Sequence, residues 1–251
     1  MSWSVAAFGV WPYVALAVFV VGHVWRWRSD QMGWTTRSSQ ISEKRLLAWG
    51  SPLFHVGMLA VLLGHAAGLL VPASVTTALG ISEHAYHLLA VTAGTISGTV
   101  LATGVVLLLL RRFVLKARLR LVTRRADVVM YVVSAVVIFC GMWATLQHNV
   151  LGAGYDYRET IAVWFRSIFA ANPSVDLMVG VPFLYQVHVV AAFALIAVWP
   201  FSRLVHVWSV PVGYLTRPLI VYRAGRQTSE LVRPSAVSGS GGSDYPVRRA
   251  R

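Results

Sequence analysis

Five long stretches of this chain contain no Asp, Glu, Lys or Arg: residues 1–25, 46–82, 84–110, 128–155 and 177–202. Each stretch is long enough to cross a bilayer, because a hydrocarbon core of ~30 Å needs about 20 helical residues. The pattern predicts five membrane-spanning helices, at about 5–25, 46–71, 86–110, 128–148 and 179–202. We expect the fifth helix to continue past Pro200 to about Val210, and Glu159–Phe169 to form a short helix on the outer interface.

The composition supports a membrane protein. Charged residues make up 12% of the chain and hydrophobic residues 57%, whereas a soluble domain has roughly 25% charged residues. These values predict an all-α fold, a polytopic membrane helix bundle of five transmembrane helices. Residues 1–223 are expected to form this membrane domain, and the Ser/Gly-rich tail 224–251 is expected to be disordered and cytoplasmic.

The net charge of +13 is distributed unequally between the two sides of the predicted bundle. Twenty of the 22 basic residues lie in 26–45, 111–125 and 203–251, and Arg158 and Arg166 alone lie in loops of the other side. Basic residues concentrate on the cytoplasmic side of membrane proteins. We therefore expect an outer N-terminus and a cytoplasmic C-terminus, with the basic charge serving topology and anionic lipids rather than nucleic acid.

Four histidines in or beside these stretches are candidate metal ligands. His55 and His65 belong to the second predicted helix, and His188 and His206 to the fifth, which runs in the opposite direction. Ionisable residues inside a membrane are functional candidates by default. Depth pairs His65 with His188 near the outer face and His55 with His206 near the cytoplasm. Two axial imidazoles on one iron give a heme suited to electron transfer, so the pattern predicts two bis-histidine hemes.

The spacing of the histidines does not fit two straight helices. His55 and His65 are 10 residues apart, or about 15 Å along a helix, whereas the 18 residues between His188 and His206 span about 27 Å. Tilt between the helices or a bend at Pro200 would be needed to bring both pairs together.

Other residues limit the chemistry. Cys140 is the single cysteine and the sequence has no CxxCH motif, so a heme here would be a non-covalent b heme. All nine acidic residues are expected outside the spans, and proton pumps and ion-coupled transporters usually need a buried carboxylate. His23 and His148, each at a helix end, are interpreted as hydrogen-bonded or interfacial residues. His84 and His87, on either side of Tyr86, either line a quinol pocket or cap the third helix.

Around the histidines the chain resembles the gamma subunit of membrane-bound respiratory nitrate reductase, a diheme cytochrome b. The matching stretches are SPLFHVGMLAVLLGHAAGLLVP (51–72) and PFSRLVHVWSVPVGYLTRP (200–218), with further similarity at WTTRSSQ (34–40) and AGTISG (93–98). The resemblance covers most of residues 5–218. One departure is the absence of Lys and Arg from residues 73–86, where family members have a lysine near the quinol pocket.

The resemblance implies the same heme pairs, a quinol oxidised near the outer heme, and electrons passed to an iron–sulfur beta subunit. That subunit feeds a molybdenum alpha subunit, which reduces nitrate to nitrite in the cytoplasm of a bacterial cell. The expected quinol site comprises Gly64, His65, His84, Tyr86 and His87. Arg203 is either a partner of an inner-heme propionate or an ordinary basic residue of the cytoplasmic side. We expect residues 26–45 and PFSRLVHVWSVPV to dock the iron–sulfur subunit.

Two alternatives remain at this stage. A b-type cytochrome of another respiratory oxidoreductase, such as a hydrogenase or formate dehydrogenase, has the same histidine chemistry. A non-heme transporter or assembly partner, with its histidines hydrogen-bonded between helices, belongs to a different class.

Overall fold

The computed structural model describes residues 2–30, 45–115, 123–152 and 154–209, and all of these residues belong to one compact unit, Met1–Val210. The regular elements of these described residues are all helices, with no strand among them, which confirms the predicted all-α class. The predicted tail 224–251, the matching segments 34–40 and 211–218, and most of the docking loop 26–45 lie outside the described residues.

Five helices of the described part are long and apolar enough to cross a membrane, as the sequence predicts. They are Val5–Ser29 (η1 and α1), Arg45–Leu70 (α2), Glu83–Leu115 (α4 and η3), Arg125–Val150 (α6 and η4) and Phe183–Phe201 (α9 and η5). Large apolar side chains such as Leu63 and Leu89 are more than half exposed. Such surfaces suit a lipid environment, because lipid tails are as apolar as these side chains.

Short helices complete the fold: α3 (Ala73–Ala78), α7 (Ile161–Phe169), α8 (Asp176–Val179) and the 3-10 helix η6 (Arg203–Ser209). Helix α7 corresponds to the predicted short helix at 159–169 but is not purely interfacial. Its Trp164 is buried, packs against Phe8 and donates a hydrogen bond from Nε1 to the Phe8 carbonyl.

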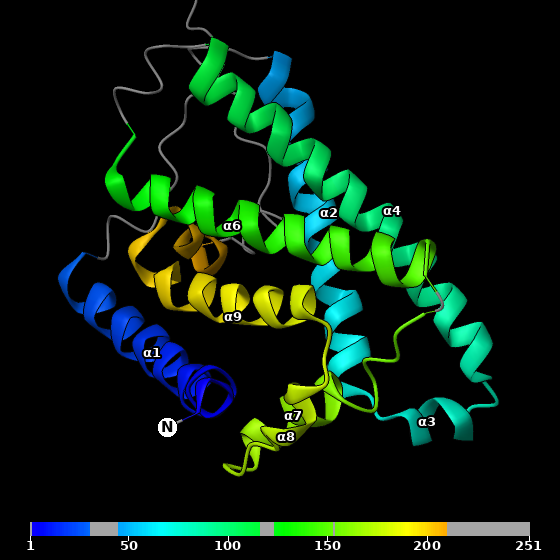
Figure 1. Cartoon of the computed structure of the whole chain (residues 1–251). Coiled ribbons are helices and arrows are strands. Elements are labelled where there is room, and N and C mark those ends of the chain that lie inside the picture. Colours follow the sequence, from blue (N-terminus) through cyan, green and yellow to red (C-terminus); the bar gives the residue numbers. More distant parts are fainter. Residues whose placement is uncertain (1, 31–44, 116–122, 153, 210–251) are drawn as a thin grey trace, which may run out of the picture. The chain divides into compact units, whose positions relative to one another are not determined.

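Helices α2 and α4 run side by side, α9 packs against both α6 and α1, and α2 also contacts α7 (Figure 1). Glycines permit the close α2–α4 approach. A Cβ at Gly57 would lie 2.5 Å from the Leu101 nitrogen, and one at Gly104 would collide with the backbone of Phe54. Small residues let membrane helices pack with their backbones in contact.

Two acidic residues expected outside the spans lie inside the long helices, so that expectation is wrong for Glu83 and Asp127. Helix α4 begins at Glu83 because the Ser82 side chain caps it, accepting a hydrogen bond from the Ala85 nitrogen. Helix α6 begins at Arg125, with the Asp127 carboxylate accepting from the Arg124 nitrogen. Because of these side-chain caps, each helix begins three residues earlier than the sequence predicts.

Candidate functional site

The four predicted histidines form two pairs, each joining α2 to the last part of the chain. The ring centroids of His55 and His206 lie 6.0 Å apart with the rings at 84° to each other. The centroids of His65 and His188 lie 5.9 Å apart, with the rings only 29° from parallel. The pairs are those predicted from depth along antiparallel helices.

A break in the fifth helix explains how both pairs form despite unequal spacing. Helix α9 ends at Val198, a 3-10 turn covers Trp199–Phe201, and Ser202 is extended at φ −111° and ψ −176°. His206 therefore lies in the separate 3-10 helix η6 rather than on a straight continuation of α9. The described part of the predicted extension, up to Ser209, is helical but broken, because Pro200 cannot donate a backbone hydrogen bond.

All four imidazoles are oriented by a backbone carbonyl. Each Nδ1 lies within hydrogen-bonding distance of one oxygen, as follows: His55 to Ser51 at 2.7 Å, His65 to Val61 at 2.8 Å, His188 to Val137 at 2.8 Å and His206 to Arg203 at 2.6 Å. A carbonyl oxygen only accepts, so Nδ1 carries the proton and Nε2 keeps its lone pair. Metal-binding histidines typically have this second contact, which fixes the ring and its tautomer.

The pair geometry fits a metal held between two imidazoles. Imidazole–metal bonds of about 2 Å place the two ring centroids about 6 Å apart, which agrees with both measured separations. Within the described residues, no group of three or more His, Cys, Asp or Glu side chains could hold a metal ion. Two axial nitrogens are sufficient for an iron whose other four donors come from a porphyrin, so the residues present fit heme.

Helix α6 provides a recess for one of these rings. A Cβ at Gly141 would lie 2.8 Å from Cε1 and 2.9 Å from Nδ1 of His188. Val137, about one turn earlier on α6, supplies the carbonyl that accepts from the same ring. The orientation of His188 thus depends on a helix that carries none of the four paired histidines.

A buried carboxylate lies beside the other pair. Asp127 is only 3% exposed, and its Oδ1 accepts a hydrogen bond of 2.8 Å from Arg203 Nε, while its Oδ2 lies 3.6 Å from Arg112. Burial lowers the pKa of Arg203, but the hydrogen bond to Asp127 and the charges of Asp127 and Tyr131 together outweigh burial, so the pKa is raised. Arg112, expected in a loop, is buried at the end of the third long helix with its guanidinium 5.5 Å from the Tyr131 ring centre. Arg203 is predicted to contact a heme propionate; in the structure its Nε donates to Asp127.

The structure does not bring the predicted quinol residues into one cluster. A Cβ at Gly64 would meet no atom within 4 Å, although this glycine adjoins His65. His84 is exposed, and His87 lies 3.4 Å from the Cβ position of Gly154. Tyr86 instead joins a polar cluster with the loop before α7.

The centre of that cluster is Arg158, which is 5% exposed. Its guanidinium lies 3.9 Å from the Tyr86 ring centre, forms an ion pair of 3.0 Å with Glu83, and donates to Thr76 Oγ1 at 2.7 Å. The hydroxyls of Tyr86 and Tyr157 are 3.1 Å apart, and Tyr157 also contacts Gly68 of α2. Burial and the hydrogen bond to Tyr86 raise the pKa of the Tyr157 phenol, so Tyr157 remains protonated at neutral pH.

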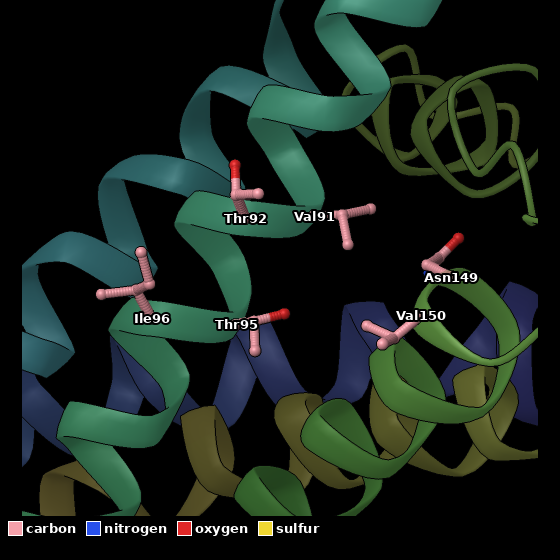
Figure 2. A pocket seen from close by; sticks show the side chains of 6 residues that line it. All are labelled: Val91, Thr92, Thr95, Ile96, Asn149 and Val150. Carbon is pink, nitrogen blue, oxygen red and sulfur yellow. The ribbon is translucent and has the colours of Figure 1, made fainter.

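A pocket of about 420 Å³ lies between α4 and η4, lined by Val91, Thr92, Thr95, Ile96, Asn149 and Val150. Figure 2 shows Thr95 pointing from α4 toward η4. Its buried hydroxyl has no hydrogen-bond partner among the described residues. None of the predicted site residues lines this pocket.

His23 is a hydrogen-bonded residue, as interpreted from the sequence. Its Nδ1 lies 2.7 Å from the Phe19 carbonyl, and its Nε2 accepts from Trp208 Nε1 at 3.0 Å. The Nδ1 contact lies within α1, and the Nε2 contact joins α1 to η6.

Sequence reasoning missed Asp127, Gly141 and Arg158 as residues that support these sites. A signal existed for the last two. Gly141 is a glycine within an otherwise bulky apolar stretch, and Arg158 is one of two basic residues on a side otherwise free of them. Asp127 offered little signal, because its position at a helix start equally suits a simple cap.

Comparison with known proteins decides the family. Residues 4–225 match the family model described as nitrate reductase gamma subunit. The chain belongs to the nitrate reductase gamma subunit family. The resemblance predicted from the histidine stretches is thereby confirmed, and the chain is a multi-pass membrane protein of this family.

Several known proteins align over most of the chain. The nitrate reductase gamma chain of Bacillus subtilis is 43% identical over 215 residues, covering 86% of this chain and 96% of the relative. The respiratory nitrate reductase 1 gamma chain of Escherichia coli is 34% identical over 220 residues, with the same two coverages. The nitrate reductase-like protein NarX of Mycobacterium tuberculosis is 49% identical over 224 residues, and the match covers 89% of this chain but 34% of that longer protein.

Proposed function

We propose that this chain is the membrane anchor and electron-transfer subunit of a respiratory nitrate reductase, a diheme cytochrome b that oxidises quinol. The observation that carries the proposal is that four histidines form two pairs. The ring centroids in each pair are about 6 Å apart, and Nδ1 of each ring is hydrogen-bonded to a backbone carbonyl. Family membership supports the assignment to nitrate reductase. It also disfavours a hydrogenase or formate dehydrogenase partner.

Each ligand pair would hold one b heme through Nε2 of its two histidines. His55 and His206 would ligate the inner heme, and His65 and His188 the outer heme. Hemes bound at two depths would carry single electrons between the two sides of the membrane. The chain's own contribution is to fix the rings: carbonyls of α2, α6 and η6 keep every Nδ1 protonated, so that each Nε2 remains available to iron.

The charge distribution supports an N-terminus outside and a C-terminus in the cytoplasm of a bacterial cell membrane. With this orientation, the His65–His188 pair lies toward the outside and the His55–His206 pair toward the cytoplasm. The basic residues that border the inner pair, such as Arg112 and Arg203, then lie near anionic headgroups.

Quinol would bind at the outer ends of α2 and α4 and release its protons outside. Gly64 lies beside the ligand His65 and has open space at its Cβ position, which would let a flat ring approach the backbone. Tyr86, His84 and His87, at the start of α4, supply polar groups on the same side. The Arg158 guanidinium over the Tyr86 ring holds this side chain in place at the start of α4.

Electrons would leave toward an iron–sulfur beta subunit and then a molybdenum alpha subunit that reduces nitrate to nitrite. No residue of this chain would contact nitrate. The proposed docking region comprises PFSRLVHVWSVPV (200–212) and residues 26–45. Arg203 would also approach an inner-heme propionate through guanidinium nitrogens other than the Nε that donates to Asp127.

Substitution of the ligands tests this function. In membranes containing the assembled complex, His65→Ala should remove one heme, retain the other and abolish heme reduction by a quinol analogue. His148→Ala is a matched control, because this histidine faces Tyr185 rather than a second histidine. Retention of both hemes in His65→Ala would contradict the ligand assignment.

A further inference from the structure

Helix η6 lacks the support that a long helix gives to a ligand. His188 lies within α9, whereas His206 lies in a seven-residue 3-10 helix that follows the extended residue Ser202. Short 3-10 segments have poor hydrogen-bond geometry and are seldom rigid alone. The position of His206 must therefore depend on side-chain contacts that hold η6 to its neighbours.

Arg203 provides such a contact and also orients the ligand. Its carbonyl oxygen lies 2.6 Å from His206 Nδ1, so Arg203 determines the tautomer and direction of the ring. The side chain of the same residue donates from Nε to Asp127 Oδ1 at 2.8 Å. A continuous path of one ion pair and one hydrogen bond thus runs from the start of α6 to His206.

Asp127 is well suited to anchor this path. It is 3% exposed, and its carboxylate also accepts from the Arg124 nitrogen, which fixes it to the first turn of α6. Oδ2 lies 3.6 Å from Arg112, whose side chain is 10% exposed. The Asp127 carboxylate consequently connects three segments: the end of the third long helix, the first turn of α6, and η6. It also places a negative charge between the two arginines Arg112 and Arg203.

We propose that Asp127 is a positioning residue for the His55–His206 site, which holds His206 in place through Arg203 and lowers the reduction potential there. The inference rests on the proposed function, since it concerns the inner heme. A negative charge nearby stabilises the oxidised, more positive iron relative to the reduced iron, and an arginine has the opposite effect. Charge and hydrogen bonding around a heme are established determinants of its potential.

Redox titration of the assembled complex in membranes, followed at the heme α-band, tests this proposal. The inner heme is identified as the one lost in His55→Ala. Asp127→Asn removes the charge with little change in shape and should raise the midpoint potential of the inner heme, leaving the outer heme unchanged. Arg203→Gln should lower the same potential. Opposite shifts from two partners of one ion pair would not follow from general loosening of the fold.

Asp127→Ala removes both the charge and the hydrogen-bond acceptor. It should weaken heme binding at the inner site by about 10–100-fold, the usual effect of losing a group that orients a metal ligand. The matched control is Asp156→Asn in the loop before α7, where the carboxylate accepts from the Arg158 nitrogen. This control should leave the inner potential unchanged.

The result that overturns the proposal is an Asp127→Asn protein with two hemes and an unchanged inner potential, or with equal shifts of both hemes. If Asp127→Asn does not assemble, Arg203→Lys decides, because it keeps the charge but loses the Nε–H donor. An assembled Arg203→Lys complex should show an altered low-spin signal of the inner heme alone. An unaltered signal, or loss of both hemes, contradicts the inference. A wild-type protein without heme would overturn the proposed function as well, whereas two wild-type hemes with unaffected variants would overturn this inference alone.

Discussion

Gly141 of α6 lies against the imidazole of His188, so closely that a Cβ there would come within 2.8 Å of Cε1. The same helix accepts the His188 Nδ1 hydrogen through the Val137 carbonyl. Helix α6 carries neither histidine of the His65–His188 pair, yet its surface determines the position and tautomer of one ring. The pair is therefore held by three helices, although only α2 and α9 supply its histidines.

Substitution of Gly141 by Ala should consequently displace His188, because a Cβ contact below 3.0 Å requires the ring or the helix to move. We expect weaker binding of the outer heme, by about 10–100-fold as for other contacts that orient a metal ligand, with the inner heme retained. A reduced-minus-oxidised spectrum of the purified complex measures this loss. Gly180→Ala, where a Cβ meets nothing within 4 Å, is the control, and equal heme content in both variants would refute the expectation.

Packing of α2 against α4 should depend on Gly104. A Cβ at this position would collide with the backbone of Phe54, which adjoins the ligand His55, and backbone cannot move aside as a flexible side chain can. Gly104→Ala should destabilise the protein by about 1–3 kcal/mol, the usual cost of overpacking. Thermal unfolding in detergent measures the effect. Gly94→Ala on the same helix has open space and should leave the midpoint unchanged.

A substitution at Gly64 should weaken quinol binding without affecting heme binding. Since a Cβ at Gly64 meets no described atom, Gly64→Ala should preserve folding and both hemes. Bulk beside His65 should nevertheless hinder the approach of a quinol ring and raise its KM, with kcat less affected. Steady-state kinetics with a soluble quinol analogue checks this, and loss of heme from the variant would show that Gly64 serves packing instead.

Arg158 should contribute more to stability than Arg166, the other basic residue of its side. The buried Arg158 guanidinium contacts Glu83, Thr76 and Tyr86, and Arg158→Gln leaves these partners unmatched. We expect a loss of about 1–3 kcal/mol, the usual cost of leaving a buried polar group without its hydrogen-bond partner. Arg166→Gln, which removes a hydrogen bond to the Leu69 carbonyl, should cost less in the same thermal unfolding assay. An equal or greater loss in Arg166→Gln would contradict this order.

The sequence was sufficient to predict the long helices and the two histidine pairs. Charge-free stretches fix the helices because buried or lipid-facing backbone must satisfy its own hydrogen bonds. The order of His55, His65, His188 and His206 along antiparallel helices then leaves one pairing by depth. Helix ends were less predictable, since the capping interactions at Ser82 and Arg124 extend α4 and α6 beyond the apolar stretches.

Residues that support the site could not be found from spacing alone. The ion pair between Asp127 and Arg203 joins positions 76 residues apart, whereas an argument from helix periodicity applies only within one helix. Gly141 likewise acts on a ring from another helix. The unequal histidine spacing did predict either tilt between the helices or a bend at Pro200, and the structure has a break in the fifth helix at Ser202.

Heme content of the isolated protein is the most direct test of bis-histidine ligation at two depths. Extraction and spectroscopic assay of porphyrin should give two non-covalent b hemes per chain, both six-coordinate and low-spin. The same assay on His55→Ala and His65→Ala should give one heme each. A correctly folded wild-type protein that contains no porphyrin, or the same heme content in wild type and both variants, would contradict the account.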